Sequence, residues 1–228
     1  MTAGTATDAP GELVTAAMLV IGDEILSGRT KDKNIGYVAD YLTAIGIDLL
    51  EVRVVPDVTE RIVEAVNALR PRYTYVFTSG GIGPTHDDIT ADAIALAFGV
   101  AIDIDPRAVA MMSERFPGQQ LTPARLRMAR IPAGADLIAN PVSKAPGFRI
   151  GNVHVMAGVP AIMQAMLDEI GPTLKTGRRL LSETIEAGLP ESIVAEPLGA
   201  IAAANPDTMI GSYPFHDGNR FATRLVVR

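Results

Sequence analysis

The chain has 228 residues, of which 48% are hydrophobic and 20% charged, and its formal net charge is −6. This length supports one large domain, or one domain with a small second one, and the composition is typical of a soluble globular protein. The acidic balance argues against a general nucleic-acid binder, and the absence of cysteine excludes disulfides and thiolate zinc sites.

The sequence also predicts the cellular setting and the domain limits. No apolar run reaches the length of a membrane helix, and the lack of cysteine fits a reducing cytoplasm, so we expect a cytoplasmic protein without membrane partners. Residues 1–12 are small and polar and are expected to be a disordered N-terminus. We predict an α/β domain over residues 13–172 and a small α+β domain over residues 173–228.

Apolar strands alternate with amphipathic helices in the first part of the chain. These elements are predicted, in order, at Ala16–Ile21, Asn34–Ile45, Ile47–Val55, Thr59–Arg70 and Tyr73–Phe77. The first strand is an unbroken apolar run, which is typical of a parallel sheet that is covered on both faces.

A glycine-rich loop, Thr78–Thr90, follows the third strand and reads Thr-Ser-Gly-Gly-Ile-Gly-Pro-Thr-His-Asp-Asp-Ile-Thr. Glycines let a ligand approach the backbone closely, and the start of the following helix offers unpaired amides. The spacing matches neither a P-loop nor the dinucleotide fingerprint. We interpret the loop as a phosphate cradle with the two aspartates at the helix start. The alternative is a tight turn in which one aspartate caps the helix.

Carboxylates follow each of these three strands: Asp23 and Glu24 after the first, Asp57 after the second, and Asp87 and Asp88 after the third. If the strands are parallel, with right-handed crossovers, all of them open on one edge of the sheet. That arrangement predicts a Mg²⁺ site, or a site for another divalent metal, between the carboxylates and the phosphates of a ligand. Taken singly, each carboxylate is more often part of a turn than of a functional site.

The middle of the chain adds two helices and a second loop. Asp105-Pro106 and Thr122-Pro123 start helices. We expect Arg125, Arg127 and Arg130 to form a solvated face, and the alternative is that this basic helix reaches an anionic ligand. The loop Asn140–Gly147 contains Lys144, which is the best cation for neutralising a phosphate, although an ordinary surface lysine is the alternative.

A hairpin and a helix complete the α/β domain. The strands Phe148–Ile150 and Val153–Met156 are predicted to form the hairpin, and Gly158 lies at the turn into a helix that ends near Ile170.

After a linker at Gly171–Arg178, the pattern predicts a strand, a helix and two strands. The helix, Pro190–Ala204, has Ile193, Val194, Leu198 and Ile201 as its apolar face, and Pro197 is expected to kink or split it. The strands are expected at Arg179–Glu186, Thr208–Tyr213 and Phe221–Val227. The sequence stops at the end of a strand, which leaves open that it is cut short.

Several motifs together resemble the molybdopterin-binding (MoaB/Mog) superfamily. They are Gly22-Asp23-Glu24-Ile25-Leu26-Ser27-Gly28, Asn34, Asp57 and Gly80-Gly81-Ile82-Gly83-Pro84-Thr85-x-Asp87-Asp88-x-Thr90. Asn140-Pro141, Ala145-Pro146-Gly147 and Gly158-Val159-Pro160 resemble the N-terminal type of domain in competence/damage-inducible protein A (CinA). The variants Ser143-Lys144 and Met156-Ala157 look closer to the domain that is fused to FAD synthase.

The resemblance implies a three-layer α/β/α fold with a mostly parallel mixed sheet, and a homo-oligomer, either dimer or trimer. It implies Asp57 and Asp88 as catalytic residues and a pocket for a phosphorylated pterin or nucleotide. We assign ligand binding to Gly22, Ser79, Gly80, Gly81, Gly83, Thr85, Asn140, Lys144, Gly147 and Gly158. We assign metal binding to Asp23, Glu24, Asp87 and Asp88.

Three functions remain open. The first is metal-dependent hydrolysis of a pyrophosphate such as ADP-ribose or FAD, as the resemblance to CinA implies. The second is binding or adenylyl transfer of molybdopterin, which the 5% aromatic content and the absence of tryptophan disfavour. The third is a non-enzymatic oligomer that retains a ligand pocket.

Overall fold

A computed structural model describes residues 13–178, 181–216, 218 and 220–228. The contacts within the chain divide it into two compact units, Met1–Arg178 and Arg179–Arg228. The prediction for residues 1–12 lies outside the described residues. Within the described ranges, no helix is both long and apolar enough to cross a membrane.

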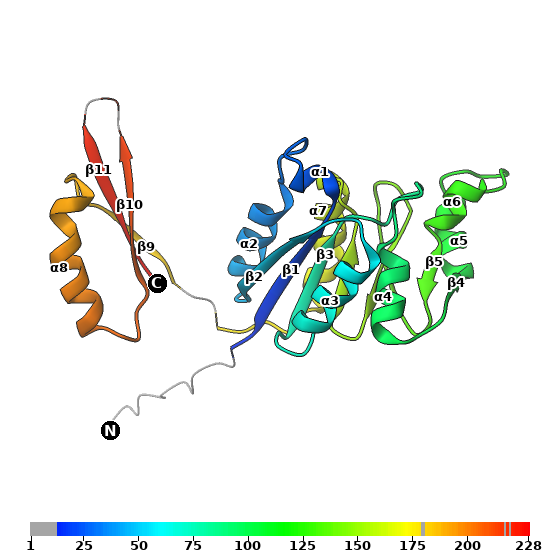
Figure 1. Cartoon of the computed structure of the whole chain (residues 1–228), viewed down its shortest axis with the longest axis horizontal. Helices are drawn as coiled ribbons and strands as arrows, with labels where there is room; N and C mark the ends of the chain where they lie inside the picture. Colours follow the sequence, from blue (N-terminus) through cyan, green and yellow to red (C-terminus); the bar gives the residue numbers. More distant parts are fainter. Residues whose placement is uncertain (1–12, 179–180, 217, 219) are drawn as a thin grey trace, which may run out of the picture. The chain divides into compact units, whose positions relative to one another are not determined.

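The first unit is built on a six-stranded sheet with the order β2-β1-β3-β8-β7-β6 (Figure 1). β1, β2, β3 and β8 are parallel, whereas β7 and β6 pair antiparallel, so the sheet is mixed and mostly parallel as predicted. The strands of this sheet are β1 (Thr15–Ile21), β2 (Asp48–Val55), β3 (Tyr75–Ser79), β6 (Asp136–Ile138), β7 (Gly147–Ile150) and β8 (Val153–Met156).

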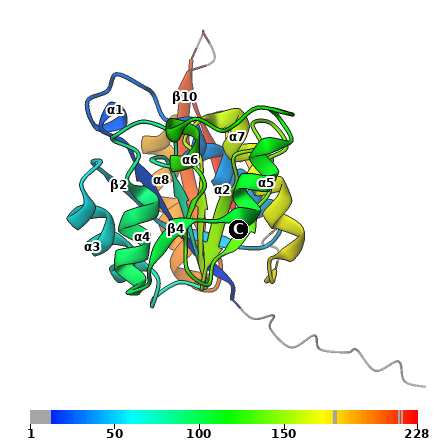
Figure 2. The ribbon, with the colours of Figure 1, turned by 90° about the vertical axis from the view of Figure 1, so that its right-hand side faces the viewer.

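Helices cover both faces of this sheet, which completes the three predicted layers. Figure 2 shows α3 and α4 on one side and α7 on the other. Because side chains alternate along β1, Leu19 packs with one helix layer and Met18 with the other. The helices are α1 (Asp23–Leu26), α2 (Asn34–Ala44), α3 (Thr59–Leu69), α4 (Thr90–Phe98) and α7 (Pro160–Ile170).

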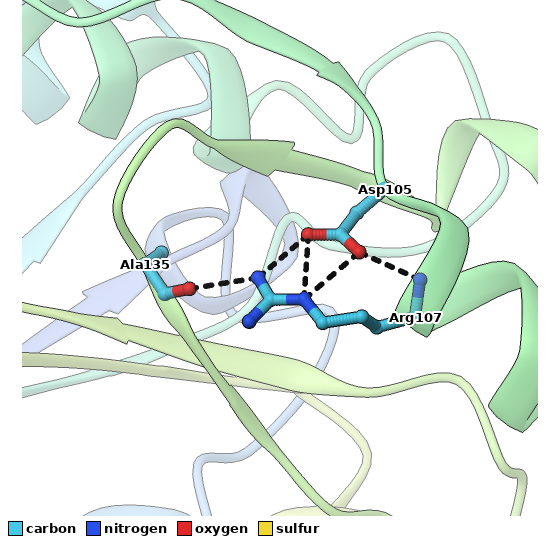
Figure 3. Close-up of polar contacts among 3 residues, drawn as sticks. All are labelled: Asp105, Arg107 and Ala135. Atoms are coloured by element: carbon cyan, nitrogen blue, oxygen red, sulfur yellow. Dashed lines mark hydrogen bonds and ion pairs between the residues drawn. The ribbon is translucent and has the colours of Figure 1, made fainter.

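A small lobe extends from the end of α4 and returns to the sheet before β6. It contains β4 (Ile102–Ile104) and β5 (Arg130–Pro132), which pair antiparallel, with α5 (Pro106–Ser113) and α6 (Pro123–Arg127). Asp105 caps α5 by accepting a hydrogen bond from the Arg107 amide at 2.7 Å, and the Arg107 guanidinium donates to both Asp105 and the Ala135 carbonyl (Figure 3). This network holds the start of α5 against the chain that enters β6.

The first unit extends past the predicted limit at residue 172. Leu174 is buried in the core beside α7, the Lys175 amide donates to the Tyr75 hydroxyl at 2.7 Å, and the Gly177 amide donates to the Gly46 carbonyl at 3.0 Å. These contacts tie the segment after the 3₁₀ turn Gly171–Thr173 to the sheet, so the division falls after Arg178.

The second unit is the expected small α+β domain. Its strands β9 (Glu183–Glu186), β10 (Ile210–His216) and β11 (Phe221–Val227) form an antiparallel sheet with the order β10-β11-β9, and α8 spans Glu191–Ala204. Two residues of the predicted β10–β11 turn, Asp217 and Asn219, lie outside the described residues.

The helix α8 continues through Pro197 as one element, so of the two effects expected of this proline, a kink or a split, the split does not occur. The prediction of its apolar face was wrong. The expected apolar face is buried at Val194 only, whereas Ile193 is 59% and Ile201 53% exposed. A three-stranded sheet gives α8 a narrow contact surface, and the helical period alone does not reveal how much of an apolar face is covered.

Candidate functional site

A cleft of about 730 Å³ lies at the carboxyl ends of the parallel strands. Gly22 and Asp57 reach it after β1 and β2, the segment Gly80–Gly83 after β3, and Gly158 after β8. The loops after these strands therefore meet at one edge of the sheet, as predicted. This is the edge at which open α/β sheets bind ligands.

Three glycines let these loops pack directly against one another. A side-chain carbon at Gly80, where φ is +113°, would lie 2.1 Å from the Ile21 carbonyl oxygen. A side-chain carbon at Gly158 would lie 3.2 Å from the Gly80 Cα, and one at Gly147 would lie 2.3 Å from the Val155 carbonyl oxygen. Backbone packing therefore requires glycine at Gly80 and Gly147, independently of any ligand, whereas at Gly158 a side chain would need only a small shift of Gly80.

The glycine-rich loop presents consecutive unpaired amides. The Gly80 amide donates to the Met156 carbonyl at 3.2 Å, but those of Gly81, Ile82 and Gly83 donate to no residue in the described part of the chain. Gly80 and Gly81 both have positive φ, and all three residues with unpaired amides line the cleft. Successive backbone N–H groups of this kind form an anion-binding nest.

The helix after this loop begins later than predicted. α4 starts at Thr90, its N-cap is Ile89, and neither Asp87 nor Asp88 caps it. Instead, the Thr90 amide donates to the Gly81 carbonyl at 2.9 Å and the Thr90 hydroxyl to the Gly80 carbonyl at 3.0 Å. The carbonyls of Gly80 and Gly81 thus accept the hydrogen bonds of the first residue of α4. Asp87 and Asp88 remain in the loop before the helix.

Asp88 shapes the loop itself. Its Oδ2 accepts hydrogen bonds from the Thr85 amide at 2.8 Å and the Thr85 hydroxyl at 2.5 Å, and it lies against Gly83. Thr85, which we predicted to contact the ligand, therefore holds Asp88. No hydrogen bond within the described residues uses Asp88 Oδ1, which remains available to a ligand or a cation.

Asp57 lies among other acidic side chains. Its Oδ2 accepts a hydrogen bond from the Asp23 amide at 2.9 Å. Burial is the main cause that raises the pKa of Asp57, and the Asp23 amide opposes this rise. The negative charges of Asp23, Glu24 and Asp87 raise the pKa further. A carboxyl group surrounded by like charges favours binding of either a proton or a cation.

The predicted metal ligands do not form a complete coordination shell. In the part of the chain that the structure describes, no three or more His, Asp or Glu residues form a group that would hold a metal ion. Asp23, Glu24 and Asp87 are exposed, whereas Asp57 and Asp88 are half-buried. Oxygen donors of this type fit a hard divalent cation, and Mg²⁺ is commonly held by one or two carboxylates together with the substrate phosphates.

Other predicted residues have structural partners. Lys144, which has a φ of +66°, forms an ion pair with Glu114 at 3.0 Å and does not line the cleft, although its neighbours Ser143 and Ala145 do. Asn140 lines the cleft but uses its side chain to fold its own loop, since its Oδ1 accepts from the Val142 and Ser143 amides.

Ser79 is buried below the cradle. The side-chain amide of Asn34 donates to the Ser79 hydroxyl at 2.7 Å and to the Gly158 carbonyl at 2.8 Å. Sequence reasoning placed Asn34 in a motif but gave it no role. The structure shows that it joins the β3–α4 loop to the β8–α7 loop, and that Ser79 takes part in this connection.

Two arginines contribute basic groups to the cleft. Arg115 and Arg125 both line it, with Phe116 between them in the chain. For Arg125 this favours the alternative, a basic helix that reaches a ligand, over the expected solvated face, whereas Arg115 was not predicted. Of the other two arginines, Arg130 forms a bidentate pair with Asp92, at 2.6 Å for both hydrogen bonds. Arg127 donates to the Asp88 carbonyl at 3.4 Å.

Comparison with known proteins defines the class first. Residues 17–176 match the family model "Probable molybdopterin binding domain", and residues 179–228 match the model "FAD synthase, middle domain". The crystal structure of the protein CinA, of unknown function, from Thermoplasma acidophilum has a TM-score of 0.66 at 35% identity, covering 71% of this chain and 98% of that one.

Sequence relatives refine this class. A protein of Caldivirga maquilingensis is 35% identical over 83% of this chain and 77% of its own length. A CinA-like protein of Desulfosudis oleivorans is 36% identical over 86% of this chain, which spans about half (51%) of that relative. The chain belongs to the molybdopterin-binding (MoaB/Mog) superfamily and carries its CinA-type domain.

Proposed function

We propose that the cleft binds the diphosphate group of a nucleotide and hydrolyses its P–O–P link with the help of a divalent cation. The observation that carries this proposal is the unpaired amides of Gly81, Ile82 and Gly83 in the same cleft as Asp57 and its acidic neighbours. One part of the site fits phosphate oxygens and the other fits a cation that offsets their charge.

The residues divide the chemistry between them. The three amides hold one phosphate, and Asp88, fixed by Thr85, keeps the loop in shape for this contact. A water molecule attacks one phosphorus as the bond from that phosphorus to the bridging oxygen breaks, and the departing phosphate keeps the electron pair. Asp57 accepts the proton of the water, for which its raised pKa is suited.

The cation would be held by Asp23, Glu24, Asp87 and the free oxygen of Asp88, together with the phosphates of the ligand. When bound, it lowers the pKa of a water molecule and stabilises the charge that develops on the phosphates. Lys144 pairs with Glu114 and does not line the cleft, whereas Arg115 and Arg125 do.

The test is a hydrolysis assay with ADP-ribose, FAD and coenzyme A in the presence of Mg²⁺, Mn²⁺ or Co²⁺. Asp57→Asn should lower kcat by about 10²-fold or more, which is the usual contribution of a general base. Asp40→Asn is the control, because Asp40 is a carboxylate of α2 away from the cleft. Absence of metal-dependent cleavage of all three substrates by the wild type would overturn the proposal.

The match to the molybdopterin-binding family favours a second candidate, in which the same cleft holds a phosphorylated pterin. Titration with molybdopterin separates the two, since a pterin-binding protein would bind it more tightly than ADP and would leave ADP-ribose uncleaved. The homo-oligomer and the cytoplasmic location remain predictions.

A further inference from the structure

The cleft has a second region with a different chemical character. Away from the strand-end loops, its wall is formed by Met112 on α5, Phe116 after α5, and Met128 after α6. These residues belong to the small lobe, whereas the amides and carboxylates of the proposed diphosphate site follow strands of the main sheet. At about 730 Å³ the cleft is of the size that proteins use for whole small-molecule ligands, and a diphosphate alone would leave the apolar wall unused.

A guanidinium group lies over the aromatic ring of this wall. The Cζ of Arg125 is 3.6 Å from the centroid of the Phe116 ring. Arg125 is half-buried, and it forms no ion pair with any residue in the described ranges. By contrast, Arg130 and Arg107 are each paired to an aspartate. Arg125 therefore has hydrogen-bond donors that nothing in the described chain uses.

The lobe holds this pair in a defined place. α5 is anchored at its start by the Asp105–Arg107–Ala135 network (Figure 3). α6 is capped by Thr122, which accepts a hydrogen bond from the Arg125 amide at 3.3 Å. The Arg115 guanidinium donates to the Val142 carbonyl at 2.6 Å, which links the end of α5 to the loop on the other side of the cleft.

We propose that the stacked pair of Phe116 and Arg125 is the subsite for the base of the nucleotide whose diphosphate occupies the cradle. This inference rests on the proposed function and names the part of the substrate that the small lobe recognises. A guanidinium plane that is stacked on one ring offers its second face to another ring. Its unused N–H groups lie in the guanidinium plane and donate only, so they match the ribose oxygens beside a base that stacks on this face.

The experiment compares two ligands that cannot be hydrolysed, measured by titration calorimetry with Mg²⁺ present. α,β-Methylene-ADP carries the ribose and the base, and methylenediphosphonate lacks both. We expect the wild type to prefer the nucleotide, and Arg125→Gln and Phe116→Leu each to weaken nucleotide binding by about tenfold, a typical effect of losing a base-stacking side chain. Binding of methylenediphosphonate should change by less than about twofold, because its contacts lie in the cradle.

Two further variants control for other effects. Arg70→Gln removes a similar guanidinium stack, with Cζ 4.2 Å from the Phe98 ring and outside the cleft, and should leave both affinities unchanged. Phe116→Tyr keeps the ring and should retain nucleotide binding. Thermal denaturation of each variant checks that the small lobe remains folded.

The outcomes separate the two proposals. If the wild type binds both ligands equally, or if the variants weaken both ligands by the same factor, the base subsite is overturned while the diphosphate cradle stands. If the wild type binds neither ligand, the proposed function fails and the base subsite fails with it.

Discussion

The effect of replacing a cradle glycine by alanine depends on the atoms that the added methyl group would contact. At Gly81, where φ is +68°, a side-chain carbon would lie 2.1 Å from the Thr90 hydroxyl oxygen. At Gly99, at the end of α4, φ is +67° and nothing lies within 4 Å. The two positions share the same backbone strain but differ in their contacts, so together they separate the two effects.

We predict that Gly99→Ala lowers the free energy of unfolding by about 1–2 kcal/mol, which is the cost of a left-handed alanine. Gly81→Ala should cost about 1 kcal/mol more, because the displaced Thr90 loses its hydrogen bond to the Gly80 carbonyl. Only Gly81→Ala should also impair binding of methylenediphosphonate. Urea denaturation and calorimetry measure the two effects, and equal losses of binding in both variants would contradict a local role of the cradle.

The ionised carboxylate of Asp57 serves the proposed function but lowers the stability of the fold. The folded protein binds the Asp57 proton more tightly than the unfolded chain does, since the pKa is raised by burial and by neighbouring charges. The ionised carboxylate therefore lowers stability at pH values above the folded pKa. This cost disappears as the pH falls through the folded pKa towards the ordinary value of an aspartate.

Accordingly, Asp57→Asn should raise the melting temperature at neutral pH, and its advantage over the wild type should shrink towards pH 4. The asparagine oxygen still accepts the hydrogen bond from the Asp23 amide, so the loop is kept. Addition of Mg²⁺ should stabilise the wild type more than the variant. A variant that is less stable than the wild type at pH 7 would show that Asp57 serves the fold instead.

At the scale of elements, the cradle depends on three segments that meet at Asn34. The first residue of α2 donates to the loop after β3 and to the loop after β8, and it is 4% exposed. Asn152 provides a matched case in the turn between β7 and β8, where its side-chain amide donates to the Arg70 and Tyr73 carbonyls, both at 2.9 Å. Each asparagine bridges two segments, but only Asn34 bridges segments of the cleft.

We therefore expect Asn34→Ala and Asn152→Ala to lower stability by similar amounts, about 1–3 kcal/mol, because each leaves two buried or partly buried acceptors without this donor. Asn34→Ala alone should weaken methylenediphosphonate binding, since the spacing of the two cradle loops is no longer fixed. The measurement is urea denaturation with calorimetry on both variants. Unchanged affinity in Asn34→Ala would show that the close packing of Gly80 on Gly158 fixes the spacing by itself.

The sequence predicted the central strands and the longer helices of the first unit to within a few residues, because apolar periodicity and caps such as Asp105 and Thr122 are local signals. The short helix α1, by contrast, was predicted as a loop. It could not predict which partner a side chain finds. Lys144 pairs with Glu114, thirty positions earlier, and the Gly81 carbonyl satisfies the start of α4 in place of an aspartate. A solvated position was predicted for Arg125 because the local sequence does not show that the small lobe packs back against the strand ends.

At the scale of the whole molecule, the two units divide the chain at Arg178, and each matches a different family model. Every residue that lines the cleft lies between Ile21 and Met166, within the first unit. The first unit also contains two hydrophobic core clusters, one on each face of its sheet. A domain with its own core is expected to fold alone.

We predict that the fragment of residues 1–178 binds α,β-methylene-ADP with an affinity within about twofold of that of the full chain, because distant groups contribute independently to binding. Titration calorimetry compares the two proteins, and circular dichroism establishes that the fragment is folded. The variant Arg125→Gln should lose affinity by the same factor in both contexts. An affinity that is at least tenfold weaker in a folded fragment would show that residues after Arg178 contribute to the ligand site, and the cleft of the first unit would then be only part of it.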